Sequence, residues 1–433
     1  MNYEETVNYL FTSAPLFQNI GAEAYKDGLQ NTIALDTHFG HPHTKYKTIH
    51  IAGTNGKGSC AHTIAAILQT AGYKTGLYTS PHLVDFRERI RVNGKKIPKQ
   101  DVIDFVEKER DFFEPLHPSF FELTTALAFE YFAKQEIDVA VIEVGLGGRL
   151  DCTNIIKPEV SIITNISFDH TQFLGNTLTQ IAKEKAGIIK HGITAVIGET
   201  VKDTKDVFEK TAKAVGAPIV FAESKPIVKS YTHCANGIML DTNMFAQQLH
   251  YELGGDYQKR NANTILCTVK ELRKKGFNIT DEAIRYGFEH VGKLTGLHGR
   301  WEVFSGKPTV ILDTGHNPGG LMYNMQQLKG IKAGKIRIII GMVSDKDINS
   351  ALKLMPKEAR YYFTKASVKR AMDERTLHSM AAKHELIGMH YPNVAEAYKA
   401  AMEDSAPNDV IYIGGSNFIV GDFLAYRSNE KRL

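Results

Sequence analysis

Residues 48–59, TIHIAGTNGKGS, carry the strongest structural signal in this sequence. The first half is a β-branched apolar run that predicts a strand, and the second half is a glycine-rich turn that leads into a helical pattern starting near Lys57. A helix N-terminus presents unpaired backbone N–H groups and the positive end of the helix dipole, so it is suited to hold phosphate. The segment therefore predicts a nucleotide-binding loop.

The residue types of this loop suit phosphate binding. Its glycines allow the backbone to approach phosphate oxygens closely, Lys57 can neutralise the outer phosphates and the Ser59 hydroxyl can ligate Mg²⁺. The spacing G-x-x-G-K-x-S differs from the common G-x-x-x-x-G-K-[ST], and an ordinary strand-to-helix connection is the alternative interpretation. We expect the nucleotide to contact Thr54, Asn55, Gly56, Lys57, Gly58 and Ser59.

The length and composition are those of an ordinary soluble protein. A chain of 433 residues predicts two or three domains, and a net charge of +4 gives no reason to expect a nucleic-acid partner. The N-terminus lacks the basic-then-apolar order of a signal peptide, and no apolar run approaches the ~18 residues of a membrane span. The cysteines lack metal-site or disulfide spacing. We expect a cytoplasmic protein that contacts neither nucleic acid nor a membrane.

Strand-like and helical patterns alternate along the chain, which predicts an α/β fold with mainly parallel sheets. Residues 89–97 predict a hairpin that turns at Asn93-Gly94, and the irregular stretch 223–255 predicts either a β excursion or a surface insertion. The other predictions are helices at 57–72, 99–113, 119–135, 257–276 and 280–291, and strands at 48–52, 75–79, 139–144, 160–165, 309–313, 336–342, 360–364 and 410–413.

A glycine-rich segment, 292–299, marks the expected domain boundary. It divides the chain into a P-loop-type, mainly parallel sheet domain at 1–299 and a smaller Rossmann-like α/β domain at 300–433. The second domain has no phosphate loop of its own. We therefore expect a nucleotide bound to the first domain to lie in a cleft that faces the second.

Polar side chains follow two more strands at the same expected sheet edge. Glu143 ends one apolar strand, and Asp169-His170 follow another. Ligands bind at the carboxyl ends of strands in open parallel sheets, so Glu143 could complete a Mg²⁺ shell begun by Ser59, with His170 as a secondary ligand. The alternatives are an acidic residue paired with an arginine and a structural histidine. Composition alone makes 181–190 a solvated helix of mixed charge.

Three more positions could contact a nucleotide. The Asn261 amide could recognise an adenine or ribose edge or could cap a helix, and Arg300 is placed to reach a phosphate across the cleft. Asp313 ends a strand of the second domain, where the turn that follows offers a structural explanation as well.

Seven motifs in order resemble the folylpolyglutamate synthase/dihydrofolate synthase family, within the larger group of Mur-type ATP-dependent amide ligases. They are HIAGTNGKGS (50–59), TSPHL…F.ERI..NG (79–94), EVGLGGRLDCTN (143–154), FDHTQFLGNTL..IAKEKAGIIK (168–190), YQKRNA (257–262), HGRW (298–301) and DTGHNP (313–318). With Gly414-Gly415-Ser416-Asn417 the resemblance reaches almost to the C-terminus. The family usually has Gly-Ala where this chain has Thr314-Gly315. The form GTNGKGS, rather than GTNGKTT, favours the folate branch over the cell-wall branch.

The resemblance implies an enzyme that uses ATP and two Mg²⁺ ions, and we expect it to be a monomer. It would join L-glutamate to dihydropteroate, forming dihydrofolate, and would extend reduced folates with further glutamates. The implied metal ligands are Ser59, Glu143, His170 and a carbamylated Lys185, since a carbamate turns a cation into an oxygen ligand. The implied catalytic residues are Lys57, Lys185, His170 and His316.

The resemblance also places the substrates. The loop that covers the pterin would contain Ser80, Pro81 and His82, with Phe86 nearby for stacking. ATP would contact Asn261, Arg300 and Asp313, with His316 beside them.

Several alternatives stay open. The chain could perform glutamate extension only, or it could be a Mur-type peptidoglycan precursor ligase with a UDP-linked substrate. A switch-type NTPase would bind a protein partner, but it would be expected to carry an Asn-Lys-x-Asp motif, which this chain lacks. A nucleotide sensor without catalysis is disfavoured because Glu143, His170 and Asp313 are all in place.

Overall fold

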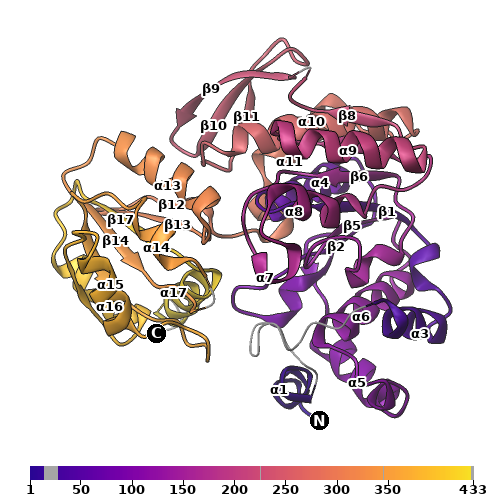
Figure 1. The fold of residues 1–433 in the computed structure, drawn as a ribbon, viewed down its shortest axis with the longest axis horizontal. Coiled ribbons are helices and arrows are strands. Elements are labelled where there is room, and N and C mark those ends of the chain that lie inside the picture. Colours follow the sequence, from indigo (N-terminus) through magenta and orange to yellow (C-terminus); the bar gives the residue numbers. More distant parts are fainter. Residues whose placement is uncertain (14–27, 225, 345, 431–433) are drawn as a thin grey trace.

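The computed structural model describes residues 1–13, 28–224, 226–344 and 346–430, which fold around three β-sheets (Figure 1). The first sheet has the strand order β4-β3-β2-β5-β1-β6-β7-β8, the second β11-β10-β9 and the third β12-β13-β17-β14-β15-β16. The predicted α/β class is confirmed, with a large and a smaller sheet that are both mainly parallel.

The first sheet is parallel from β2 to β8 and ends in the predicted hairpin, β3 and β4. Asn93 and Gly94, both with positive φ, form its turn. Strands β5 and β6 bury every residue, as expected for strands covered on both faces. The strands are β1 (Lys47–Ala52), β2 (Thr75–Tyr78), β3 (Ile90–Val92), β4 (Lys95–Lys96), β5 (Val139–Glu143), β6 (Val160–Ile163), β7 (Thr194–Ile197) and β8 (Ile219–Phe221).

Helices cover both faces of this sheet. On one face, α4 (Lys57–Thr70), α10 (Gln258–Lys274) and α11 (Asp281–Glu289) share a core with Val139 and Val141 of β5. The alternate residues Ala140 and Ile142 face α5 (Lys99–Phe113) and α6 (Phe120–Lys134) on the opposite side, because successive strand residues point to opposite faces. Farther along that side lie α8 (Leu178–Ala186) and α9 (Lys202–Val215). At the N-terminus, α1 (Tyr3–Ser13) and α3 (Gln30–His38) pack on α5 and α6.

The irregular stretch forms the second sheet, a small antiparallel one. It consists of β9 (Val228–Cys234), β10 (Gly237–Thr242) and β11 (Leu249–Tyr251). Ile238 and Leu240 turn inward and join the core under α10 and α11, so this β excursion is packed against the first sheet's helices.

The third sheet is parallel except for its edge strand β12, which pairs antiparallel with β13. Its strands are β12 (Arg300–Phe304), β13 (Thr309–Asp313), β14 (Ile336–Ile340), β15 (Arg360–Phe363), β16 (Gly388–His390) and β17 (Val410–Gly414). The helices around it are α13 (Pro318–Gly330), α14 (Ile348–Leu352), α15 (Glu374–Ala382), α16 (Val394–Glu403) and α17 (Asn417–Glu430). Since β12 begins at Arg300, we propose to keep the domain boundary at residue 299.

In the part of the chain that the structure describes, no helix combines the length and apolar character needed to cross a membrane.

Candidate active site

The glycine-rich loop joins β1 to α4, and two of its glycines have close neighbours. Gly56 has a φ of +88°, and a Cβ there would lie 2.4 Å from Asn261 Oδ1 of α10. A Cβ on Gly58 would lie 3.0 Å from Nη2 of Arg300 at the start of β12. Lys57 Nζ donates hydrogen bonds to the carbonyl oxygens of Gly53 and Thr54 at 3.0 and 3.2 Å. The loop is therefore packed between α10 and the third sheet, with its lysine folded across the turn.

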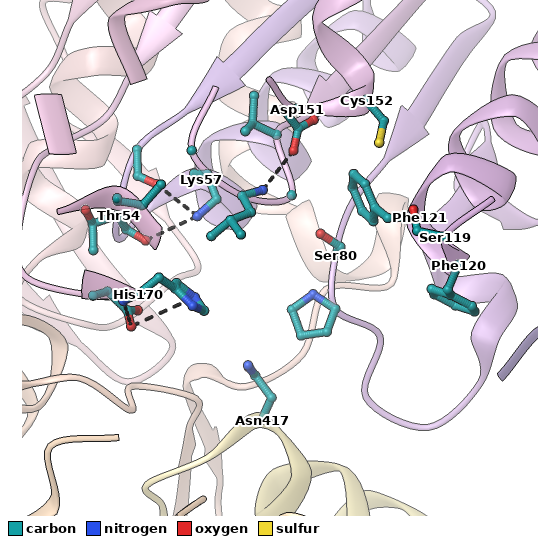
Figure 2. Close-up of a pocket in the computed structure, with 18 of the residues that line it drawn as sticks. Thr54, Lys57, Ser80, Ser119, Phe120, Phe121, Asp151, Cys152, His170 and Asn417 are labelled. Atoms are coloured by element: carbon teal, nitrogen blue, oxygen red, sulfur yellow. Dashed lines mark hydrogen bonds and ion pairs between the residues drawn. The ribbon is translucent and has the colours of Figure 1, made fainter. Parts of the chain in front are cut away.

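A cavity opens where the carboxyl ends of the first sheet's strands face the third sheet (Figure 2). Of the expected catalytic, metal-binding, nucleotide-binding and substrate-binding residues, those that line it are Thr54, Lys57, Ser80, Pro81, His170, Lys185 and His316. Figure 2 shows Lys57 and His170 on one side of this cavity and Phe121 on the other, with Asn417 reaching in from α17. Both α/β units thus contribute to one site.

Lys185 is a buried lysine near the end of α8. Burial, reinforced by the charge of Lys57, lowers the pKa of its amine to about 7. The loop after β5 packs directly on this helix end, because a Cβ on Gly148 would lie 2.8 Å from the Glu184 carbonyl oxygen and 3.0 Å from that of Lys185. A large share of the Lys185 amine is uncharged at neutral pH, so it is a competent nucleophile.

Replacing Gly148 with alanine should lower the free energy of unfolding by about 1–3 kcal/mol, because overpacking meets backbone oxygens that cannot move aside. Gly330→Ala is the matched control, since a Cβ at that position has no neighbour within 4 Å. Urea unfolding of both variants measures the difference. A Gly148→Ala variant as stable as the control would contradict the packing argument.

Asp169 connects the two α/β units. It accepts a hydrogen bond from the Lys346 ammonium, and its Oδ2 accepts one from Asn317 Nδ2 at 3.1 Å and lies 3.5 Å from His316 Nε2. Burial opposes ionisation, but the bond with His316 and the surrounding cationic groups hold the pKa of Asp169 well below its usual range. Asn55 and Asn317 also exchange amide hydrogen bonds of 3.2 and 3.0 Å. The glycine-rich loop is therefore bonded directly to the second unit.

Ser59 and Glu143, the two expected oxygen ligands of a metal, are buried and do not line the cavity. Ser59 Oγ accepts from Gln258 Nε2 at 3.1 Å, and Glu143 Oε2 accepts from the Ser80 N–H at 3.2 Å. Burial raises the pKa of Glu143 against the opposing charge of Lys57, which indicates a carboxylate whose charge the protein compensates incompletely. Among the described residues, no group of three or more His, Cys, Asp or Glu side chains could hold a metal ion. A metal here would also need phosphate oxygens, which is usual for Mg²⁺.

Asn261 and Arg300 both contact the glycine-rich loop but do not line the cavity. Asn261 Nδ2 donates to Gln258 Oε1 at 2.8 Å, which links it to the Ser59 hydroxyl. Arg300 donates to the hydroxyl of Thr314, the residue where this chain departs from the family pattern. The threonine therefore holds the arginine over Gly58. The expected contacts of Asn261 and Arg300 with ATP stay predictions.

Asp313 has the structural role that the sequence left open. Its two oxygens accept hydrogen bonds from the Tyr257 hydroxyl, the Trp301 and Gly315 backbone N–H groups and the Asn324 amide, at 2.6 to 2.8 Å. Tyr257 directly precedes α10, whereas the other three donors belong to the second unit, so the buried carboxylate ties that unit to the helix that supports the loop. Its expected contact with ATP stays a prediction.

The structure does not place His82 and Phe86 at the cavity wall. His82 Nδ1 accepts a hydrogen bond from Arg89 Nε at 2.8 Å, and Phe86 is 3% exposed in the core, against the edge of Phe120. The aromatic residues that line the cavity are instead Phe120 and Phe121 of the first unit and Phe418 of the second, none of which the sequence singled out. The expected stacking of Phe86 on the pterin stays a prediction. The signal for Phe120 and Phe121 was a pair of aromatic residues directly after a helix-capping serine.

Comparisons with known proteins cover nearly the whole chain. The Mur ligase middle domain matches residues 51–269, and the Mur ligase glutamate ligase domain matches residues 299–417. A folylpolyglutamate synthase of Lacticaseibacillus casei is 34% identical, over 97% of this chain and 97% of its own length. A dihydrofolate synthase/folylpolyglutamate synthase of Escherichia coli is 33% identical, over 84% of this chain and 83% of its own length.

A solved structure of the same family is also similar to this chain. Escherichia coli FolC in complex with DHPP and ADP superposes with a TM-score of 0.85 at 29% identity, covering 100% of this chain and 99% of that one. The chain spans half the length of a probable bifunctional folylpolyglutamate synthase/dihydropteroate synthase of Haloferax volcanii, at 33% identity over 98% of this chain.

Proposed function

This chain belongs to the folylpolyglutamate synthase/dihydrofolate synthase family of the Mur ligases, and from that premise we propose how its cavity performs an ATP-dependent ligation. It adds L-glutamate to dihydropteroate, which forms dihydrofolate, and to the γ-carboxylate of reduced folates. The observation that carries the proposal is the meeting of the glycine-rich loop, the low-pKa Lys185 and side chains of the second unit in one cavity. The four free cysteines suit a cytoplasmic protein, and we propose that it acts there as a monomer.

The reaction needs an activated carboxylate, because an amine cannot displace oxide from a carboxylate. ATP transfers its γ-phosphoryl group to the carboxylate of the pteroate or terminal glutamate, which yields an acyl phosphate and ADP. The amine of L-glutamate then attacks the acyl carbon, the amide bond forms and inorganic phosphate leaves. Positioning and charge neutralisation dominate phosphoryl transfer. Lys57, the loop N–H groups and Arg300 supply this neutralisation from the protein.

Two sets of donors fit Mg²⁺, one buried beside the glycine-rich loop and one at the cavity wall. Ser59 and Glu143 would hold one ion, and His170 with a carbamylated Lys185 would hold a second. When bound, the ions neutralise phosphate charge. The incompletely compensated Glu143 and the uncharged fraction of Lys185 support this assignment, since a neutral amine is the form that reacts with CO₂.

The remaining roles follow from position. Thr54, Asn55, Gly56 and Gly58 border the nucleotide phosphates, while Asn261, Arg300 and Asp313 shape the rest of the nucleotide site. His316 and Asp169 join the two units over the intermediate, which keeps water from the acyl phosphate. Ser80 and Pro81 line the acyl-substrate side of the cavity together with Phe120 and Phe121.

The proposal predicts that ADP release depends on both L-glutamate and a pterin. With ATP and Mg²⁺, the purified chain should release ADP in the presence of dihydropteroate and yield dihydrofolate, identified by its mass. It should also extend tetrahydrofolate, whereas omission of either glutamate or the pterin should abolish release. If the chain extends tetrahydrofolate but forms no dihydrofolate from dihydropteroate, its function is glutamate chain extension only. ADP release with UDP-muramyl precursors, and with neither pterin, would replace the folate assignment.

A further inference from the structure

Arg89 is a buried cation of the cavity that the mechanism above does not use. It ends the 3-10 turn η3 (Phe86–Arg89), is 3% exposed and lines the cavity beside Ser80 and Pro81. Burial lowers the pKa of its guanidinium to about 10, so the group remains charged at neutral pH.

Two neighbours hold the guanidinium in place. Its Nε–H donates to His82 Nδ1 at 2.8 Å, and its carbon lies 5.1 Å from the centroid of the Phe120 ring. Burial lowers the pKa of His82 to about 3, so the imidazole is neutral and its Nδ1 can accept. Since His82 engages Nε, the two terminal nitrogens of Arg89 are available to a ligand in the cavity.

Among the described residues, no carboxylate lies close enough to Arg89 to form an ion pair. Glu143 and Glu88 affect its pKa only by longer-range charge interactions. Its neighbour on the same turn, Arg87, shows the usual alternative, since it pairs with Asp85 at 2.6 Å. A buried cation without a paired anion is costly. The free-energy cost of burying the unpaired Arg89 guanidinium therefore indicates that its anionic partner arrives with the substrate.

We propose that Arg89 binds the α-carboxylate of the terminal glutamyl residue of the folate substrate. The guanidinium fork matches a carboxylate with two parallel hydrogen bonds. The reacting γ-carboxylate must reach the phosphate at Lys57, whereas Arg89 stands over Phe120, and Figure 2 shows Phe120 and Lys57 on opposite sides of the cavity. This inference rests on the proposed function and deepens it.

A contact between Arg89 and an α-carboxylate distinguishes reduced folates from dihydropteroate. A reduced folate carries an α-carboxylate beside the γ-carboxylate that reacts. Dihydropteroate has a single carboxylate, and that one becomes the acyl phosphate. Arg89 should therefore serve the extension of folates and contribute little to the synthesis of dihydrofolate.

The first test is Arg89→Met, which removes the charge and keeps an unbranched apolar chain. We expect kcat/KM for tetrahydrofolate to fall roughly 100-fold, because a charge-assisted bidentate contact is lost. The value for dihydropteroate should change by less than about 3-fold, and thermal stability should not fall, since a buried unpaired cation has been removed. Arg87→Met is the matched control and should affect neither substrate selectively. Equal losses on both substrates, or a loss on neither, would overturn the assignment.

A folate whose α-carboxylate is replaced by a carboxamide provides the second test. The kcat/KM of the native enzyme should be about 100-fold lower for this analogue than for tetrahydrofolate. Arg89→Met should show no such difference, because the effects of removing two groups that contact each other are not additive. Full discrimination retained in Arg89→Met would contradict the contact. A native enzyme that releases no ADP with any pterin would instead reject the proposed function, so the two failures are distinguishable.

Discussion

Lys185→Ala should lower dihydropteroate-dependent ADP formation by about 1,000-fold, the order of effect seen when a group that stabilises transition-state charge is removed. The side chain lines the cavity and is buried, so no solvent-exposed residue replaces it. Lys183, exposed on the same helix, provides the control, and Lys183→Ala should retain activity. Initial rates of ADP release measure both. Full activity in Lys185→Ala would remove the lysine from the mechanism.

Carbamylation of Lys185 predicts two further results. Formate or acetate should restore part of the activity of Lys185→Ala by placing a carboxylate in the vacated space, while an uncharged alcohol of similar size should not. In metal-free native enzyme, uptake of ¹³C-labelled CO₂ should rise as the pH increases from 6 to 8 and then level off. The reason is that the reactive neutral amine predominates above its pKa of about 7. A lysine with the ordinary pKa of about 10.4 would still be gaining carbamate above pH 9.

Local patterns in the sequence were sufficient for most of the elements that carry the site. The strand that precedes the glycine-rich loop, the loop itself and the helix from Lys57 were predicted within a few residues, because their apolar spacing and glycines act over short distances. The hairpin turn at Asn93-Gly94 was predictable for the same reason.

Contacts between distant residues account for what the sequence did not reveal. Asp169 meets Lys346 across 177 positions, and composition gives no sign that these two are partners. The family resemblance implied that Phe86 lies near the pterin, whereas the structure buries its ring in the core and leaves Arg89 of the same turn at the cavity. The direction in which a side chain points depends on how separate elements pack, and the spacing of residues in the sequence does not show that packing.

Lys57→Met should lower kcat by about 100- to 1,000-fold while ATP affinity changes by less than about 10-fold. Charge on the transferred phosphoryl group is stabilised most in the transition state. Lys57 Nζ now bonds the Gly53 and Thr54 carbonyl oxygens, so the cation already sits within the turn that would cradle the phosphates. Rapid-quench measurement of acyl phosphate formation, together with ATP binding at equilibrium, separates the two effects. Equal losses in binding and in kcat would indicate that the lysine only holds the nucleotide.

Lys57 has a second effect that a matched pair of variants can isolate. Its charge is the largest contribution, after burial, to the low pKa of Lys185. Removing that charge should raise the pKa of Lys185, so Lys57→Met should take up less CO₂ at pH 7 than native enzyme and should approach it at higher pH. Lys57→Arg keeps the charge but changes its shape, and should therefore preserve CO₂ uptake while still slowing phosphoryl transfer. Loss of CO₂ uptake in both variants would mean that the geometry of the loop, rather than its charge, controls Lys185.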